Sequence, residues 1–343
     1  MLKVLKNTVL EMVRGAGVFS LLAQSHWLQQ RLLILCYHGI SIKDEHEWES
    51  GLYITPEVFR GRLEILAKQK YQVLPLDEGL RLLREGTLPR KSVVITFDDG
   101  FYDFYRQAFP ALREFGFPAT VYQTTYYSDH PFAIFNLVLS YLLWRGRGQR
   151  LDASTCGVTG IFDLASLEAR HLALQAFLEF ARQQDYSTAQ KDELAGRLAS
   201  QLGIDYAEIL ESRILQLMTP AEINAIAASG IDLQLHTHRH RTPMDEALFT
   251  REIRDNRAWL APHAATVPNH FCYPSGVYRL EFLPWLRAEN VVSATTCDHG
   301  LAERATEPLI LPRFLDSMGC SEAAFEGWLC GFSSFLSRPK ASN

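Results

Sequence analysis

The chain has 343 residues, of which 47% are hydrophobic and 21% are charged, and its formal net charge is −5 at pH 7. This composition is typical of a globular protein with a sizeable core, organised as one large α/β domain or as two domains. The acidic balance gives no indication of a nucleic-acid-binding surface, and the sequence contains no long runs of like charge, low-complexity segments or internal repeats.

Residues 1–30 are expected to form an N-terminal helical segment. Its apolar residues share one helical face, and they are Leu2, Leu5, Val9, Met12 and Val13. Charged residues interrupt the segment, which leaves no apolar run of signal-peptide or transmembrane length and no clear cleavage site. We favour a helix that packs on the domain over a helix that lies on a membrane surface. We expect a cytoplasmic protein, or one peripheral to the cytoplasmic face of a membrane.

From about residue 31 the chain alternates between apolar strands and amphipathic helices. Strands are predicted over residues 32–37, 71–76, 93–97 and 119–123. Helices are predicted after the N-cap Thr55, over residues 76–83, and between Gly100 and Gly116. This alternation predicts a parallel sheet or barrel.

The alternation is interrupted between about residues 129 and 215. Helical patterns dominate this stretch, at 135–144, 166–183 and 188–202. We expect a helical subdomain here, inserted into an α/β barrel that is built from residues 31–128 and 216–343. Because the insertion leaves from the end of a strand, we expect it to border the groove on that face of the barrel.

The strand–helix alternation resumes at residue 219, where Thr219 and Pro220 begin a helix. Further strands are predicted over residues 231–235, 271–273, 291–296 and 309–314. Six cysteines are spread over the chain without a C-x-x-C pair, and Cys36, Cys272 and Cys297 lie in the apolar runs of predicted strands or directly after them. We therefore expect buried free thiols and a reducing compartment.

Polar side chains recur where the predicted strands end. They are His38, Asp98, Asp99, His236, His238, His240, Tyr273, Ser275, Asp298, His299 and Arg313. In a parallel α/β barrel the carboxyl ends of all strands meet on one face, where active sites are built from several strands at once. The recurrence predicts a functional site on that face.

The most informative stretch is Val93–Gly100, a β-branched strand that ends in two adjacent carboxylates. Such acids are costly unless their charge is used, although a helix N-cap with a spare acid explains the spacing equally well. His236 and His240 are four residues apart, which suits a solvated loop or a pair of metal ligands. One Asp with two His forms a ligand set for a catalytic zinc or similar ion with a position left for water. The second carboxylate would then accept a proton from that water.

Two motifs together resemble the signature of the polysaccharide deacetylases, the NodB-homology group known as carbohydrate esterase family four. They are Thr96-Phe97-Asp98-Asp99-Gly100 and His236-Thr237-x-x-His240. The resemblance extends from about Leu32 to Arg313, apart from the insertion. It implies a distorted (β/α)₇ barrel and the metal-dependent hydrolysis of N-acetyl, less often O-acetyl, groups on a sugar or polysaccharide.

The resemblance also implies a role for each matching residue. Asp98 would be the catalytic base, acting on a metal-bound water, and the divalent metal would be held by Asp99, His236 and His240. Zinc is the expected ion, and nickel, cobalt and manganese also suit a mixed nitrogen and oxygen site. The substrate groove would include Tyr273, Pro274 and Gly276, with the backbone amide of Tyr273 donating to the oxyanion.

The chain departs from the family pattern at the general acid. Many members carry a histidine in a late Leu-x-His motif, and the corresponding residues here are Leu311-Pro312-Arg313. His38 and His299 are candidates for the acid because both are predicted at the catalytic face. Arg313 cannot release a proton near neutral pH, but it could orient Asp98 and keep it ionised.

Two other functions remain open at this point. The chain could be an amide hydrolase that acts on a non-carbohydrate substrate, or a carbohydrate-binding relative that has kept the metal site without catalysis. Retention of both Asp98 and Asp99 argues against the latter, since binding needs no free base. The expected partner is an acetylated glycan or a lipid-linked sugar, and peripheral membrane contact through the N-terminal helix is a further expectation.

Overall fold

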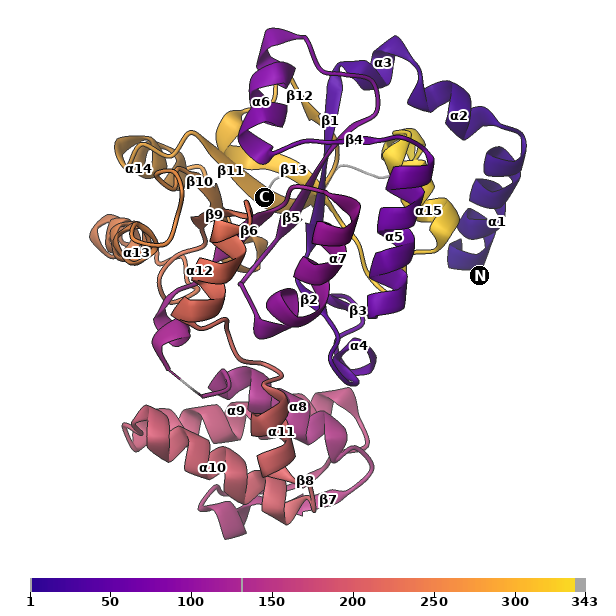
Figure 1. The fold of residues 1–343 in the computed structure, drawn as a ribbon. Coiled ribbons are helices and arrows are strands. Elements are labelled where there is room, and N and C mark those ends of the chain that lie inside the picture. Colours follow the sequence, from indigo (N-terminus) through magenta and orange to yellow (C-terminus); the bar gives the residue numbers. More distant parts are fainter. Residues whose placement is uncertain (1, 131, 337–343) are drawn as a thin grey trace. The chain divides into compact units, whose positions relative to one another are not determined.

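A closed barrel of parallel strands forms the core of the larger unit, residues 1–126 and 218–343, in the computed structural model, which describes residues 2–130 and 132–336 and, for residues 2–6, the backbone alone (Figure 1). Around the barrel each strand pairs in parallel with the next, and the last pairs with the first. In this order the strands are β1 (Arg31–Tyr37), β5 (Ser92–Phe97), β6 (Thr120–Gln123), β9 (Asp232–Leu235), β10 (His270–Cys272), β11 (Ser293–His299) and β13 (Leu311–Leu315). The predicted α/β barrel is confirmed.

Shorter strands and helices surround this barrel. The short strands are β2 (Gly39–Ile40), β3 (Tyr53–Ile54), β4 (Gln72–Val73) and β12 (Ala302–Glu303). The helices that connect the barrel strands are α5 (Pro56–Lys68), α6 (Leu76–Glu85), the π-helical turn η1 (Phe104–Ala108) with α7 (Phe109–Phe115), α12 (Pro220–Ala228), α13 (Glu246–Leu260) and α14 (Phe282–Ala288). Short helices complete the unit at α4 (Glu45–Trp48), η4 (Pro274–Gly276), η5 (Pro308–Ile310), α15 (Glu322–Leu329) and α16 (Phe332–Phe335).

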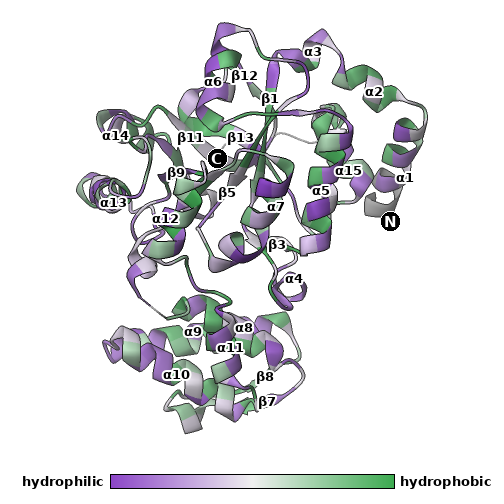
Figure 2. Cartoon of the chain, viewed as in Figure 1, coloured by the Kyte–Doolittle hydropathy of each residue, from purple (hydrophilic) through white to green (hydrophobic). Residues whose placement is uncertain are grey.

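The strands bury both of their faces, so their side chains alternate between two apolar clusters. On β1, Leu33 and Leu35 belong to the cluster between the strands and the outer helices, whereas Leu32 and Ile34 belong to a second cluster inside the barrel. Leucines of α6 join the inner cluster. Figure 2 shows the central strands as mainly hydrophobic, while the helices carry both hydrophobic and polar residues. Because successive side chains of a strand point to opposite faces, every second residue of each barrel strand faces the barrel interior.

The N-terminal segment forms α1 (Leu2–Gly15), α2 (Val18–Ala23) and α3 (His26–Gln29). Leu10 of α1 is fully buried in the outer core, and Arg14 forms ion pairs with Glu322 and, at 2.6 Å, with Glu326. The predicted packing face was partly wrong, because Met12 is 62% exposed and Leu10 takes its place. The side chains of Leu2 and Leu5 lie outside the described residues.

Over the described residues, no helix combines the length and the apolar character that crossing a membrane requires. The contact of α1 with a membrane surface and the cellular location stay predictions.

Residues 127–217 form a second compact unit. It contains α8 (Phe135–Arg145), α9 (Leu167–Gln183), α10 (Thr188–Gln201), α11 (Tyr206–Ser212), the turns η2 (Tyr126–Asp129) and η3 (Ala153–Cys156), and an antiparallel hairpin of β7 (Arg150–Asp152) and β8 (Ile161–Asp163). Its own core includes Leu139, Leu142, Phe177, Leu194 and Leu198, all of which are fully buried. The hairpin escaped prediction because strands of three residues carry too little periodicity.

Several predicted strands begin or end at other residues in the structure, and the one expected over 291–296 is Ser293–His299. The strand expected over 71–76 is limited to β4, because α6 already begins at Leu76. The strand expected over 309–314 begins only at Leu311, since Pro308–Ile310 form a 3₁₀ turn in which the Glu307 side chain accepts a hydrogen bond from the Leu309 amide.

Candidate metal centre

The two carboxylates of the Asp-Asp-Gly stretch face different partners because the backbone turns between them. Asp98 continues the direction of β5, and its amide donates to the Tyr37 carbonyl at 2.9 Å. Asp99 and Gly100 then adopt positive φ angles of 68° and 80°. A Cβ atom on Gly100 would lie 2.0 Å from the Gln123 side chain, so only glycine fits this turn.

Asp99, His236 and His240 form one cluster at the carboxyl ends of β5 and β9. One carboxylate oxygen of Asp99, Oδ1, lies 3.0 Å from His236 Nε2 and 3.0 Å from His240 Nε2. The ligand atoms of the three side chains all lie within 4.8 Å of one another. The structure therefore brings together the three residues that the two motifs singled out.

This cluster has the chemistry of a site for a divalent ion. The other ring nitrogen of His236, Nδ1, lies 2.8 Å from the Cys272 carbonyl, to which its N–H donates, so that Nε2, which faces Asp99, carries the lone pair that can bind an ion. Burial would raise the pKa of Asp99, but His240 and His236 outweigh burial and hold that pKa well below its usual range. A carboxylate with two imidazole nitrogens suits zinc and leaves a fourth position open.

Asn256 of α13 fixes the first of the two histidines. Its side-chain oxygen accepts a hydrogen bond from the His236 amide at 2.9 Å, and its side-chain nitrogen donates to the Gln123 carbonyl and to Thr125 Oγ1, each at 3.0 Å. Asn256 is fully buried. It therefore ties the end of β9 to the end of β6.

Glu252, one helical turn earlier, holds the loop between the two histidines. Its carboxylate accepts hydrogen bonds from the Arg239 amide at 2.8 Å and from Arg241 Nε at 2.7 Å. Within this loop Thr237 and His240 have positive φ angles of 62° and 52°, which non-glycine residues adopt only when their surroundings enforce them. The hydrogen bonds to Asn256 and Glu252 of α13 thus hold the loop in the conformation that places His236 and His240 next to Asp99.

Replacing Asn256 with Leu should weaken zinc binding by about 10–100-fold, the usual effect of removing a partner that orients a metal ligand. The variant would leave the His236 amide without an acceptor and free the end of β9 to shift. A competitive zinc titration with a chromophoric chelator measures the affinity, and circular dichroism confirms folding. The control is Arg251→Gln, an exposed position on the same helix. Equal zinc affinity in the two variants would contradict the role of Asn256.

Asp98 points into the barrel and pairs with Arg313 of β13. The guanidinium of Arg313 donates two hydrogen bonds of 2.7 Å to Asp98, from Nη1 to Oδ1 and from Nη2 to Oδ2. The two side chains are almost entirely buried. Burial alone would raise the pKa of Asp98, yet the charge and hydrogen bonds of Arg313 hold it well below its usual range. Asp98 is therefore ionised throughout the neutral range, as expected from the Arg313 pairing that the sequence suggested.

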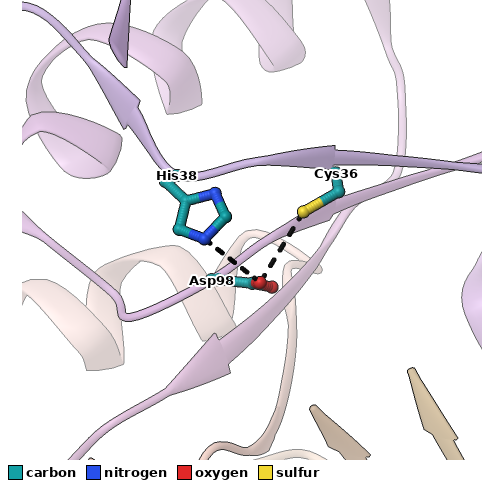
Figure 3. A group of neighbouring side chains, drawn as sticks. All are labelled: Cys36, His38 and Asp98. Carbon is teal, nitrogen blue, oxygen red and sulfur yellow. Dashed lines mark hydrogen bonds and ion pairs between the residues drawn. The ribbon is translucent and has the colours of Figure 1, made fainter. Parts of the chain in front are cut away.

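The structure separates the two candidates for the missing general acid. His38, directly after β1, lies with Nε2 3.6 Å from Asp98 Oδ2, as Figure 3 shows. Burial lowers the pKa of His38 despite the nearby charge of Asp98. His299 is exposed, and its ring packs edge-on against Phe314 and Trp328 of the outer core. Of these two candidate acids, only His38 lies next to Asp98.

The role predicted for Tyr273 is wrong. Its side chain is fully buried in the outer core, where its hydroxyl donates to the Leu309 carbonyl at 2.9 Å. Its backbone amide donates to the Thr295 carbonyl at 3.2 Å and is not available for an oxyanion. The cause is the period of two on β10, where Cys272 faces the interior and Tyr273 faces outward. A groove role for Pro274 and Gly276, in the turn that follows, stays a prediction.

Two cysteines that no sequence motif marks are also part of the site. Cys272 Sγ and Cys36 Sγ lie 3.3 Å and 3.6 Å from Asp98 Oδ2, and Cys272 Sγ lies 3.2 Å from Arg313 Nη2. Both thiols are fully buried. Extending the period of two back from His38 along β1 would have placed Cys36 on the interior face.

A family model described as polysaccharide deacetylase matches residues 85–145. The chain is 32% identical to the poly-beta-1,6-N-acetyl-D-glucosamine N-deacetylase of Escherichia coli K12 over 101 residues. This aligned stretch covers 29% of this chain and 15% of that protein. The stretches that match curated relatives span no more than 31% of those relatives' length.

Solved structures share the fold over most of the chain. The deacetylase PplD from Streptococcus pyogenes, solved in complex with acetate, has a TM-score of 0.57 at 20% identity and covers 86% of this chain and 96% of its own. IcaB from Ammonifex degensii has a TM-score of 0.54 at 17% identity, and the match covers 88% of this chain and 97% of IcaB. The chain is thus similar in sequence to polysaccharide deacetylases over part of its length, and it shares the fold of these two solved structures over most of its length.

Proposed function

We propose that the chain is a metal-dependent hydrolase that removes N-acetyl groups from an acetylated sugar polymer. The observation that carries the proposal is the position of Asp98, an ionised carboxylate held by Arg313 directly beside the Asp99, His236 and His240 cluster. A base next to a metal site is required for hydrolysis and is of no use for binding alone. The similarity to a poly-beta-1,6-N-acetyl-D-glucosamine N-deacetylase supports an N-acetylated glycan as the substrate.

Asp99, His236 and His240 would hold the ion, for which zinc is the first candidate. When bound, such an ion supplies a Lewis acid that polarises the acetyl carbonyl and acidifies water. Asp98 would accept the proton of the attacking water. Arg313 keeps Asp98 ionised at the cost of a weaker proton affinity, because it holds the pKa of that carboxyl low.

His38 would donate a proton to the nitrogen of the leaving amine. Its Nε2 atom faces Asp98, and its side chain is 13% exposed, so the ring can exchange protons with solvent. The two catalytic groups come from adjacent strands, since β1 and β5 pair in parallel with Tyr37 opposite Phe97. An acid and a base on adjacent strands can reach opposite sides of one amide bond.

Purified chain loaded with zinc should release acetate from N-acetylglucosamine oligomers and not from O-acetylated xylan. Chelation should stop the release, and added zinc should restore it. The screen should compare β-1,6-linked with β-1,4-linked oligomers, and lipid-linked with free forms, since these distinguish the substrate classes that remain open. Release of acetate from none of the N-acetylated glycans would refute the proposal.

Replacing His38 with Ala should lower kcat by about 10²–10⁴-fold, the usual contribution of a positioned general acid. The matched control is His299→Ala, which removes the other candidate histidine and should leave kcat within about twofold, because surface substitutions change little. Steady-state acetate release from the same oligomer measures both variants. A large loss in His299→Ala with none in His38→Ala would assign the acid to His299.

A further inference from the structure

A second group of ligand atoms surrounds Asp98 on the side that faces β1. Figure 3 shows the side chains of Cys36 and His38 both directed at this carboxylate. Cys36 Sγ and His38 Nε2 each lie 3.6 Å from Asp98 Oδ2, and all three atoms lie within 4.8 Å of one another. Cys36 and His38 share this face because they are two residues apart at the end of β1.

The spacing of these atoms is that of ligands around an ion. A tetrahedral zinc with bonds of about 2.0–2.3 Å separates its nitrogen, oxygen and sulfur ligands by about 3.4–3.6 Å. The 3.6 Å between His38 Nε2 and Asp98 Oδ2 is too long for a good hydrogen bond. The other ring nitrogen of His38, Nδ1, is buried and makes no hydrogen bond to the described residues. The ring is therefore close to the carboxylate without being engaged by it.

We propose that Cys36, His38 and Asp98 form a second cation site, distinct from the Asp99, His236 and His240 cluster, which takes a thiophilic divalent ion such as Zn²⁺ or Cd²⁺. A thiolate with an imidazole and a carboxylate selects such ions over Mg²⁺ or Mn²⁺, which prefer oxygen ligands. On binding, a metal–sulfur bond forms and the thiol proton leaves to solvent. A water molecule completes the coordination.

The neighbouring cysteine supplies a less suitable alternative. Asp98, His236 and Cys272 also lie within 4.8 Å of one another. Both nitrogens of His236 are already engaged, however, with Nε2 toward Asp99 and Nδ1 toward the Cys272 carbonyl. Cys272 Sγ also lies 3.2 Å from the Arg313 guanidinium, which repels a cation. Cys36 is therefore the thiol that the second ion takes.

The second site is expected to fill after the first. Arg313 places a positive charge 2.7 Å from each carboxylate oxygen of Asp98, and this charge opposes a cation at Asp98. The Asp99 cluster has no such neighbour among its described contacts, and His240 is 36% exposed, which gives an ion access to it. One equivalent of zinc should therefore occupy the Asp99 cluster, and an excess should occupy both sites.

This inference, where it concerns activity, rests on the proposed function. The second ion would bind the groups proposed as base and acid, Asp98 and His38. It would occupy His38 Nε2 in place of the proton that this atom would donate, and it would block the carboxylate. Excess zinc or cadmium should therefore inhibit the enzyme reversibly, whereas excess magnesium should not.

The binding claim is tested without any activity measurement. The full chain is titrated with Cd²⁺ while the ultraviolet sulfur-to-cadmium charge-transfer band is recorded. We expect the band in the wild type and in Cys272→Ser, and its loss in Cys36→Ser. Cys272 is the matched control because it is equally buried and also touches Asp98. Absence of the band in the wild type, or its persistence in Cys36→Ser with loss in Cys272→Ser, would overturn the assignment.

A measurement on the wild type alone guards against a Cys36 variant that does not fold. X-ray absorption at the cadmium edge, with two equivalents bound, should show a sulfur neighbour. A shell of nitrogen and oxygen only would overturn the site.

The inhibitory claim uses acetate release, with each variant compared with its own uninhibited rate. We expect excess zinc to reduce the wild-type rate at least tenfold and the Cys36→Ser rate far less. A cadmium band combined with an undiminished rate would overturn inhibition but not the site. No acetate release under any condition would refute the proposed function, and the cadmium band would still decide the ion site.

Discussion

Replacing Asp98 with Asn is expected to lower kcat by about 10²–10⁴-fold while zinc content stays close to one ion per chain. Asn keeps the shape of the side chain and can hydrogen-bond the attacking water, yet it cannot accept the proton. The substitution also leaves the fully buried Arg313 without its counter-charge, which should cost about 3–5 kcal/mol of unfolding free energy. The rate must therefore be expressed per folded molecule, with the folded fraction taken from urea unfolding.

Asp99→Asn is the matched comparison, because it changes the adjacent carboxylate in the same way. A neutral amide oxygen is a poorer ligand than a carboxylate, so this variant should lose zinc. Its activity should be partly restored by excess manganese, which favours oxygen ligands and so avoids the thiol of Cys36. If Asp98→Asn loses the metal and Asp99→Asn keeps it, the two roles are reversed. If both remain fully active, the site lies elsewhere.

Replacing Arg313 with Met is expected to destabilise the protein by about 3–5 kcal/mol and to make activity sensitive to acid. Without Arg313, burial dominates and the pKa of Asp98 rises. A raised pKa means that Asp98 becomes protonated, and so inactive as a base, as the pH falls through a range in which the wild type is still ionised. The acid limb of kcat/KM should therefore move to higher pH.

A second buried ion pair, between Arg62 and Asp316, supplies the control. Arg62 Nε lies 2.9 Å from Asp316, and both side chains are buried. Arg62→Met should cause a comparable loss of stability, because it too leaves a buried carboxylate unpaired. It should leave the acid limb of kcat/KM where the wild type has it. An unchanged pH profile in Arg313→Met would show that Arg313 has only a structural role.

The barrel and the metal cluster could be predicted from the sequence because their signals are local. The β-branched run before Asp98 fixes a buried strand, and the five residues from His236 to His240 carry two ligands with their spacing. Each motif also lies at the end of a strand, where the topology of a parallel barrel brings such ends together. Little tertiary information was needed for these residues.

The errors and omissions arose where the answer depended on contacts between distant segments. Tyr273 was misplaced because its motif was matched without asking which face of β10 it occupies. Asn256 and Glu252 were missed because their role depends on how α13 packs, and no motif marks them. The ion pair of Arg313 with Asp98 joins positions that are 215 residues apart, and only the missing histidine at that place pointed to it.

The most direct test of the account is a titration of the metal-free chain with zinc, in which acetate release from an N-acetylglucosamine oligomer and bound zinc are measured in the same samples. We expect activity to rise in proportion to bound zinc, to reach its maximum at one ion per chain, and to fall as further zinc binds. Asp99→Asn should show no rise over the first equivalent. Activity that is independent of bound zinc, or acetate release that is absent with one ion bound, would contradict the account.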